Sequence, residues 1–118
     1  MPHHENALRM RHMLDASREA MTLAKGKARK DLDGDRLLAL ALTRLLEIMG
    51  EAAGRVSKEI QALHPEIPWA QIVGLRNRLI HGYDSVDMDI LWAVITEDLP
   101  RLVAALEKAA PPEEGGRT

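Results

Sequence analysis

Several common features are missing from this sequence, and each absence narrows what the protein can be. Its 118 residues include no cysteine, which excludes disulfides, thiolate nucleophiles and cysteine-ligated zinc. No apolar run approaches the ~20 residues needed to cross a bilayer. The N-terminal residues show no apolar stretch of the kind found in secretion signals. We therefore expect a cytoplasmic protein.

Neither sign of charge is in large excess. The chain has 16 basic and 18 acidic residues, a net charge of −2. This balance argues against a polybasic coat for nucleic acid and against a membrane-surface peptide. It leaves room for a localised basic site, because net charge does not describe how charges are distributed.

Aromatic residues are scarce, with no phenylalanine, two tryptophans and one tyrosine, while hydrophobic residues make up 46% of the chain. The abundant residues are alanine, leucine, methionine, glutamate and arginine, which favour helices, whereas strands favour aromatic and β-branched residues. The composition therefore predicts an all-α protein with enough apolar residues to form a core.

Hydrophobic periodicity predicts four helices, at about 6–25, 35–63, 69–81 and 87–109. Short links between them favour an antiparallel four-helix bundle, formed as a single domain by residues 1–110. The third helix is short, and Pro100 should kink the fourth near Thr96 because proline cannot donate a backbone hydrogen bond. Residues 111–118, rich in proline, glutamate and glycine, are predicted to be a disordered tail.

Two glycines lie within the predicted second helix, at Gly50 and Gly54. A glycine inside a helix costs up to ~1 kcal/mol relative to alanine. Their presence indicates that another helix approaches closely there. The approaching helix could belong to the same chain or to a second copy across a dimer interface.

The predicted third helix carries an unusual concentration of polar residues. Arg76 lands in the middle of its apolar arc, where a charged guanidinium needs either an acidic partner such as Glu47 or Glu51, or access to a ligand. Asn77 and His81 are four residues apart and share a neighbouring face. Arg76 and His81 are five apart, so on a regular helix they cannot meet at one small group. An arginine and a histidine meet at one group only if the helix ends near His81, or if a second chain supplies one of the two side chains.

An arginine and a histidine without a metal suit chemistry on a phosphodiester. No spacing typical of metal ligands, phosphate loops or dinucleotide-binding turns occurs in the chain, so we expect no cofactor. The planar guanidinium of arginine matches phosphate oxygens. A histidine can take a proton from a ribose 2′-OH near neutral pH and later return it. RNA carries its own nucleophile, so the pair is compatible with metal-independent RNA cleavage that leaves 2′,3′-cyclic phosphate and 5′-OH ends.

Residues 76–83, RNRLIHGY, match the R-x4-H-x-Y motif of the HEPN superfamily. More narrowly, the chain resembles the HepT family of ribonuclease toxins from HepT/MntA, type VII-like toxin–antitoxin systems. The resemblance extends to residues 47–53, 65–69, 83–87 and 98–100. It covers nearly the whole chain except its ends.

The resemblance implies a helical bundle that forms a homodimer, with the two copies of the motif facing one another across a cleft. It implies Arg76 and His81 as the catalytic pair and Asn77 as a supporting residue. It also implies that Tyr83 is modified with AMP by a cognate MntA-like minimal nucleotidyltransferase, which acts as the antitoxin. The added negative charge beside a phosphate-binding site would repel RNA.

Further residues are weaker candidates. Arg44 and Arg78 could contact neighbouring phosphates, or could be ordinary solvated surface charges. Glu47 and Glu51 could orient Arg76.

A rival interpretation is a non-catalytic helical module that binds a nucleotidyltransferase partner, with the motif only holding the dimer together. The slight net negative charge and the few aromatic residues favour it, because RNA-binding proteins are usually basic and rich in stacking side chains.

Overall fold

The computed structural model describes residues 2–81 and 85–109, with all side chains in these ranges except those of residues 2–4 and His81. In chain order its elements are α1 (Pro2–Ala24), α2 (Asp31–Gly34), α3 (Arg36–Gly54), α4 (Lys58–Leu63), α5 (Trp69–Val73), α6 (Leu75–Leu79), β1 (Ile80–His81), β2 (Ser85–Val86), α7 (Met88–Ala93), the π-helical turn η1 (Val94–Asp98) and α8 (Leu99–Ala109). Apart from one pair of two-residue strands, the described structure is helical, which confirms the predicted all-α class. The predicted tail at 111–118 lies outside the described residues.

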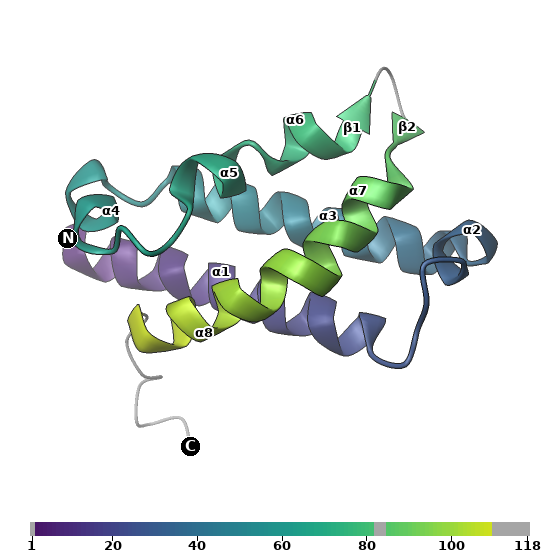
Figure 1. The fold of residues 1–118 in the computed structure, drawn as a ribbon. Helices are drawn as coiled ribbons and strands as arrows, with labels where there is room; N and C mark the ends of the chain where they lie inside the picture. Colours follow the sequence, from purple (N-terminus) through teal and green to yellow (C-terminus); the bar gives the residue numbers. More distant parts are fainter. Residues whose placement is uncertain (1, 82–84, 110–118) are drawn as a thin grey trace.

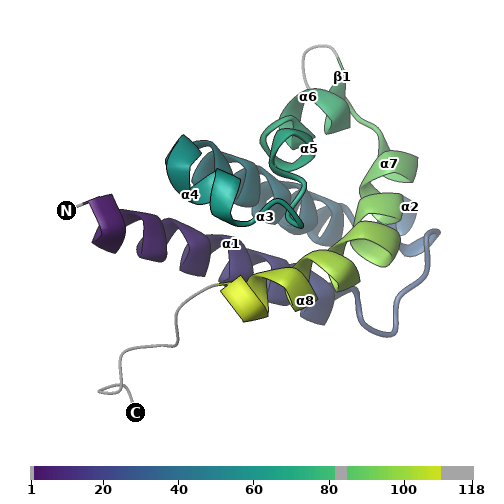
Figure 2. The same ribbon diagram turned by 60° about the vertical axis from the view of Figure 1, so that its left-hand side comes forward.

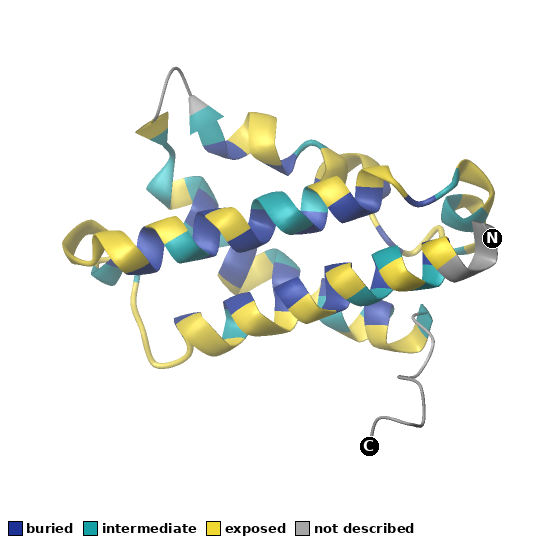
Figure 3. Cartoon of the chain, turned by 180° about the vertical axis from the view of Figure 1, so that it is seen from behind, coloured by how far each residue is buried: buried dark blue, intermediate teal, exposed yellow. Residues whose placement is uncertain are grey.

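The helices pack around one buried apolar cluster. The long helices α1 and α3 lie side by side and run antiparallel, α5 and α6 lie along one side of α3, and the segment from α7 to α8 crosses the bundle to reach α1 (Figures 1 and 2). In a view from behind, buried and exposed positions alternate along α1 and α3, as expected for helices with one apolar face (Figure 3). The most completely buried side chains come from all of the long segments: Met13, Leu42, Leu46, Met49, Leu79, Leu91, Leu99 and Leu106.

The predicted continuous helix over 35–63 is wrong, because the chain breaks between α3 and α4. Asp35 begins α3 as expected, its carboxylate accepting the Leu38 N–H at 3.0 Å. Ser57 then caps a new helix by accepting the Ile60 N–H at 3.3 Å. The buried Asn6 of α1 holds this cap in place: its oxygen accepts the Ser57 N–H at 2.9 Å, and its amide donates to the Ser57 hydroxyl at 3.1 Å.

The predicted third helix over 69–81 is also divided. Gly74 separates α5 from α6, and the helix stops at Leu79, after which Ile80 adopts an extended backbone. Ile80 and His81 form β1, which pairs antiparallel with β2 in the register Ile80–Val86 and His81–Ser85. Helical periodicity gave no sign of this strand pair, because it is too short to show an alternating pattern.

The predicted kink in the fourth helix is confirmed and takes the form of the π-helical turn η1. The Leu99 N–H donates to the Val94 carbonyl, one residue further back than in an α-helix. Pro100, which follows directly, has no N–H to continue a regular helical ladder. At the start of this segment Asp87 caps α7 by accepting the Ile90 N–H at 3.0 Å.

Gly50 marks the point where α5 approaches α3. A Cβ atom on Gly50 would lie 2.9 Å from the Ile72 carbonyl oxygen, whereas one on Gly54 would lie 3.9 Å from the nearest Val73 methyl carbon. Of the two alternatives drawn from the sequence, packing within the chain accounts for the glycine at position 50. This close approach sets the distance between α3 and the segment that carries the candidate site.

One exposed ion-pair network joins the start of α7 to the turn before α3. The Arg29 guanidinium donates to Asp89 at 2.8 Å and to Asp33 at 3.1 Å. These hydrogen bonds, of which the one accepted by Asp89 has the larger effect, raise the pKa of Arg29 above its ordinary value. The arginine therefore stays charged and bridges α2 and α7.

Candidate active site

The short helix α6 presents three consecutive polar side chains to solvent. Arg76, Asn77 and Arg78 are all exposed, while the flanking Leu75 and Leu79 are buried in the core. Two leucines four residues apart therefore fix the orientation of a five-residue helix. The remaining surface of α6 is exposed and carries the hydrogen-bond donors of these three polar side chains.

Arg76 is exposed rather than buried, so the expectation that it sits within an apolar arc is wrong. Its side chain is 67% exposed. The physical reason is the break at Gly74, which interrupts the helical register counted from Trp69, so that α6 buries Leu75 and Leu79 instead. The guanidinium is accessible to a ligand, and it also has one of the acidic partners considered from the sequence.

Glu47 of α3 holds the Arg76 guanidinium from one side. The two groups form an ion pair with an Nε–Oε2 distance of 3.5 Å, and the Glu47 side chain is only 18% exposed. Glu47 also pairs with Arg44 at 3.6 Å, and Arg44 reaches Glu51 at 3.7 Å. Of the two acids predicted to orient Arg76, Glu47 contacts it directly, whereas Glu51 pairs with Arg44.

His81 follows α6 on an extended backbone, paired with Ser85. The helix ends two residues before it, at Leu79, so one of the two conditions for Arg76 and His81 to converge is met by the backbone. The His81 side chain is not described, and Tyr83 lies outside the described residues. The predicted roles of His81 and Tyr83, and that of Asn77 as a support, therefore stay predictions.

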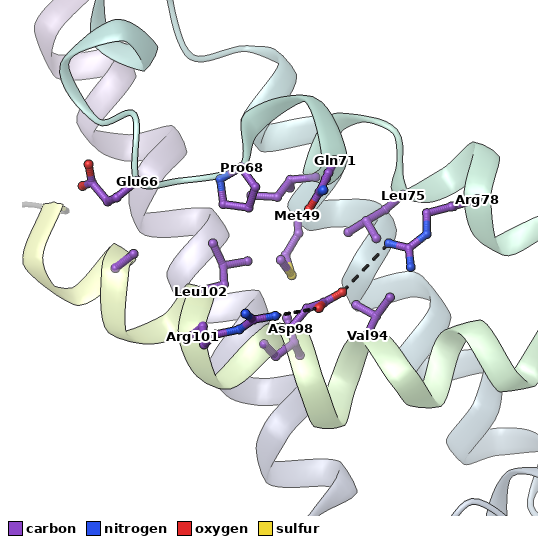
Figure 4. A pocket seen from close by; sticks show the side chains of 13 residues that line it. Met49, Glu66, Pro68, Gln71, Leu75, Arg78, Val94, Asp98, Arg101 and Leu102 are labelled. Atoms are coloured by element: carbon purple, nitrogen blue, oxygen red, sulfur yellow. Dashed lines mark hydrogen bonds and ion pairs between the residues drawn. The ribbon is translucent and has the colours of Figure 1, made fainter.

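Arg78 turns to the other side of α6, away from the Arg76–Glu47 pair. Its guanidinium lies 3.9 Å from the Asp98 carboxylate of η1, which also pairs with Arg101 at 3.3 Å. All three side chains line a groove between the α5–α6 segment, which carries Arg78, and the η1–α8 segment, which carries Asp98 and Arg101 (Figure 4). The sequence analysis did not predict the groove, because it depends on the contact between two segments that are distant in the chain.

Two features are absent from the described part of the chain. It contains no group of three or more histidine, aspartate or glutamate side chains placed to hold a metal ion. No helix within residues 2–81 and 85–109 is long and apolar enough to span a membrane.

The site thus combines a solvent-facing arginine, anchored by a carboxylate at the surface of a helical bundle, with a histidine just beyond the end of the same short helix. The ribonuclease HepT-like family model matches residues 13–109. The chain belongs to this family, which confirms the HepT resemblance and, at the level of the family, the predicted class of RNA-cleaving hydrolases.

Individual relatives agree with this assignment. A Thermococcus cleftensis protein named "Probable ribonuclease HepT" is 42% identical over 74 residues, covering 63% of this chain and 67% of its own. A protein of Caldanaerobacter subterraneus subsp. tengcongensis, named as a "Putative RNase", is 36% identical over 93 residues, covering 79% and 83%. A Methanocaldococcus jannaschii protein with the same kind of name is 30% identical over 95 residues, covering 80% and 87%. No solved structure is found to match this chain.

Proposed function

We propose that the protein is a metal-independent endoribonuclease toxin of a type VII-like toxin–antitoxin system, acting in the cytoplasm. The observation that carries this proposal is the exposed guanidinium of Arg76, anchored by Glu47, on a helix that ends two residues before His81. One apolar cluster extends from α1 to α8, which supports treating residues 1–110 as a single catalytic domain.

In the proposed reaction Arg76 binds the non-bridging oxygens of one RNA phosphate through its planar fork. Neutral His81 takes the proton of the neighbouring ribose 2′-OH, and the 2′ oxygen attacks phosphorus. The bond from phosphorus to the 5′ oxygen breaks, and the imidazolium returns its proton to that oxygen. The products are a 2′,3′-cyclic phosphate and a 5′-OH, with neither a metal nor an activated water required. Asn77, exposed between Arg76 and Arg78, supports the site.

The same proposal includes a homodimer with the two sites facing one another. A stripe on α3 supports a partner on this side, because Leu37, Leu40, Arg44, Glu47 and Glu51 follow one another at three- and four-residue intervals, and all but Glu47 are exposed. Leu37 is 79% exposed and Leu40 is 48% exposed. A second copy pairing along this stripe would cover the two leucines and bring its own α6 close to the first.

Regulation is proposed to act through Tyr83, modified with AMP by a cognate MntA-like nucleotidyltransferase. Tyr83 follows His81 by two residues, so an added phosphate would place negative charge beside the site that binds the RNA phosphate. Incubation with ATP and a cognate MntA-like nucleotidyltransferase should add the mass of one adenylyl group to the wild-type protein. The Tyr83→Phe variant should gain none, and equal labelling of that variant would reject Tyr83 as the acceptor.

The assignment of Arg76 and His81 is tested with the Arg76→Ala and His81→Ala variants. Both should lose RNA cleavage, while size-exclusion chromatography and circular dichroism show an unchanged folded dimer. Cleavage that persists in either variant would reject the assignment. Absence of cleavage by the wild type, together with a dimer weakened by His81→Ala, would favour the non-catalytic binding module instead.

A further inference from the structure

The groove between the α5–α6 segment and the η1–α8 segment lies beside α6 and has no part in the proposed reaction. It encloses about 360 Å³, which lies at the lower end of the volumes found for small-molecule sites. An α-helix with its side chains is ~10–12 Å across, so the groove suits one planar group better than a helix of another protein.

The floor of this groove is apolar. Leu75 and Ile72 of the α5–α6 segment, Met49 of α3, and Val94 and Leu102 of the opposite segment line it. In Figure 4 the Met49 sulfur lies at the back of the groove, between the two segments. Met49 itself is fully buried, its sulfur accepting the Ser17 hydroxyl at 3.2 Å, so the surface open to a ligand comes from its apolar neighbours, which suit the face of a planar ring.

The rim beside α6 is polar and positive. Arg78 and Arg101 share the single carboxylate of Asp98, at 3.9 and 3.3 Å, which leaves one positive charge in excess. Their side chains are 46% and 80% exposed, so both guanidiniums can contact a phosphate without being desolvated first. Asp98 offers oxygen atoms to the N–H groups of a base. The other acid of the groove, Glu66, stands at its far end (Figure 4).

This groove lies directly across α6 from the arginine of the proposed cleavage site. Arg76 faces Glu47 on one side of the helix, Arg78 faces Asp98 on the other, and Asn77 is exposed between them. A single RNA strand that crosses α6 would meet the three side chains in order. The nucleotide beyond Arg78 would then lie over the groove.

We propose that this groove binds one nucleobase of the RNA substrate, next to the linkage held by Arg76, and so contributes to the choice of cleavage position. The inference rests on the proposed ribonuclease function and adds a specificity site to it. Its ligand is an RNA base with an attached phosphate: the ring lies on the floor at Leu75 and Leu102, and the phosphate contacts Arg78 and Arg101.

The test uses the full chain and a short single-stranded RNA of mixed sequence whose riboses carry 2′-O-methyl groups. This RNA binds but cannot be cut by internal attack, so affinity is measured without turnover. Abasic nucleotides are introduced at each position in turn. One position should weaken binding by about tenfold, the loss expected for one stacked base, and its neighbours should have much smaller effects.

Two variants link that position to the groove. Gln71→Trp places an indole over the floor and should lower affinity for the intact RNA about tenfold, with no further loss for the abasic RNA. Arg101→Ala should weaken binding of both RNAs, whereas Lys108→Ala, which removes the same charge from an exposed position of α8 outside the groove, should not. Thermal melting checks that all three variants fold.

The outcomes separate this proposal from the one on which it rests. If unmodified RNA is cut by the wild type and not by His81→Ala, but abasic positions and Gln71→Trp have no effect, the groove binds no base and only this inference is overturned. It is also overturned if Gln71→Trp leaves RNA binding intact and abolishes binding of the nucleotidyltransferase, because the occupant is then a protein. RNA that is neither bound nor cut overturns both proposals.

Discussion

At the scale of single residues, the candidate site depends on Arg76, whose carboxylate partner Glu47 also pairs with Arg44. Glu47 is mostly buried and contacts both Arg44 and Arg76, whereas the two arginines are more than half exposed. Ion pairs of this exposure contribute little to stability, typically below ~1 kcal/mol. In the proposed reaction, Glu47 therefore serves to position the guanidinium for a phosphate.

Glu47→Gln should lower kcat for RNA cleavage by about tenfold while changing the free energy of unfolding by less than ~1 kcal/mol. The amide keeps the shape of the side chain but removes the charge that orients Arg76. Initial-rate kinetics and thermal melting measure the two quantities. The matched control is Glu51→Gln, which removes the same charge from a residue that pairs with Arg44 rather than with Arg76. Equal loss in both variants would show that the net charge of the cluster matters rather than the positioning of Arg76.

At the scale of elements, the close approach of α5 to α3 sets where α6 and its arginines stand. The approach is possible because Gly50 has no side chain at the point where the Ile72 carbonyl oxygen meets α3. Gly54, the last residue of α3, has only ordinary van der Waals neighbours. Close packing against α5 therefore accounts for Gly50 but not for Gly54.

Gly50→Ala should destabilise the fold by ~1–3 kcal/mol, because the new methyl group would collide with a backbone oxygen that cannot move freely. Gly54→Ala should leave stability unchanged or raise it by up to ~1 kcal/mol, since alanine is the better helix former and the space is open. Urea unfolding of the two variants provides the comparison. A Gly50→Ala variant as stable as Gly54→Ala would contradict the packing described here.

The helical class, the short third segment and the kink before Pro100 could be predicted from the sequence, because they follow from composition, periodicity and the missing proline N–H. The breaks at Ser57 and Gly74 could not. The break at Ser57 depends on Asn6, a residue distant in the sequence that hydrogen-bonds to the N-cap of α4. The break at Gly74 shifts the helical register of a segment whose apolar positions would also fit one continuous helix. The same shift explains why Arg76 was placed within an apolar arc, whereas Glu47, one of the two acids considered as its partner, does contact it.

At the scale of the whole molecule, the stripe on α3 adjoins the Arg76 cluster, so the dimer that we propose would link assembly to activity. Its apolar end is formed by Leu37 and Leu40, and its charged end pairs with α6 through Glu47. Exposed leucines at helical spacing on one face are typical of an association surface. The dimer that we propose uses this face.

Leu40→Glu should therefore convert the dimer to a monomer and abolish RNA cleavage, since two carboxylates would meet across the two-fold axis without partners. Analytical ultracentrifugation and a cleavage assay measure the two effects. Leu63→Glu is the control: Leu63 is 70% exposed on α4, away from the stripe, and its replacement should preserve both the dimer and the activity. A Leu40→Glu variant that stays dimeric would place the interface elsewhere.

The most direct measurement is the chemical identity of the ends produced when the purified protein cuts RNA in the presence of EDTA. Attack by the ribose 2′ oxygen, with Arg76 and His81 as the only catalytic groups, predicts undiminished cleavage with 2′,3′-cyclic phosphate and 5′-OH ends, and no cleavage of an RNA whose 2′ hydroxyls are methylated. Cleavage that stops on chelation, or that leaves a 5′-phosphate and a 3′-OH, would contradict the account.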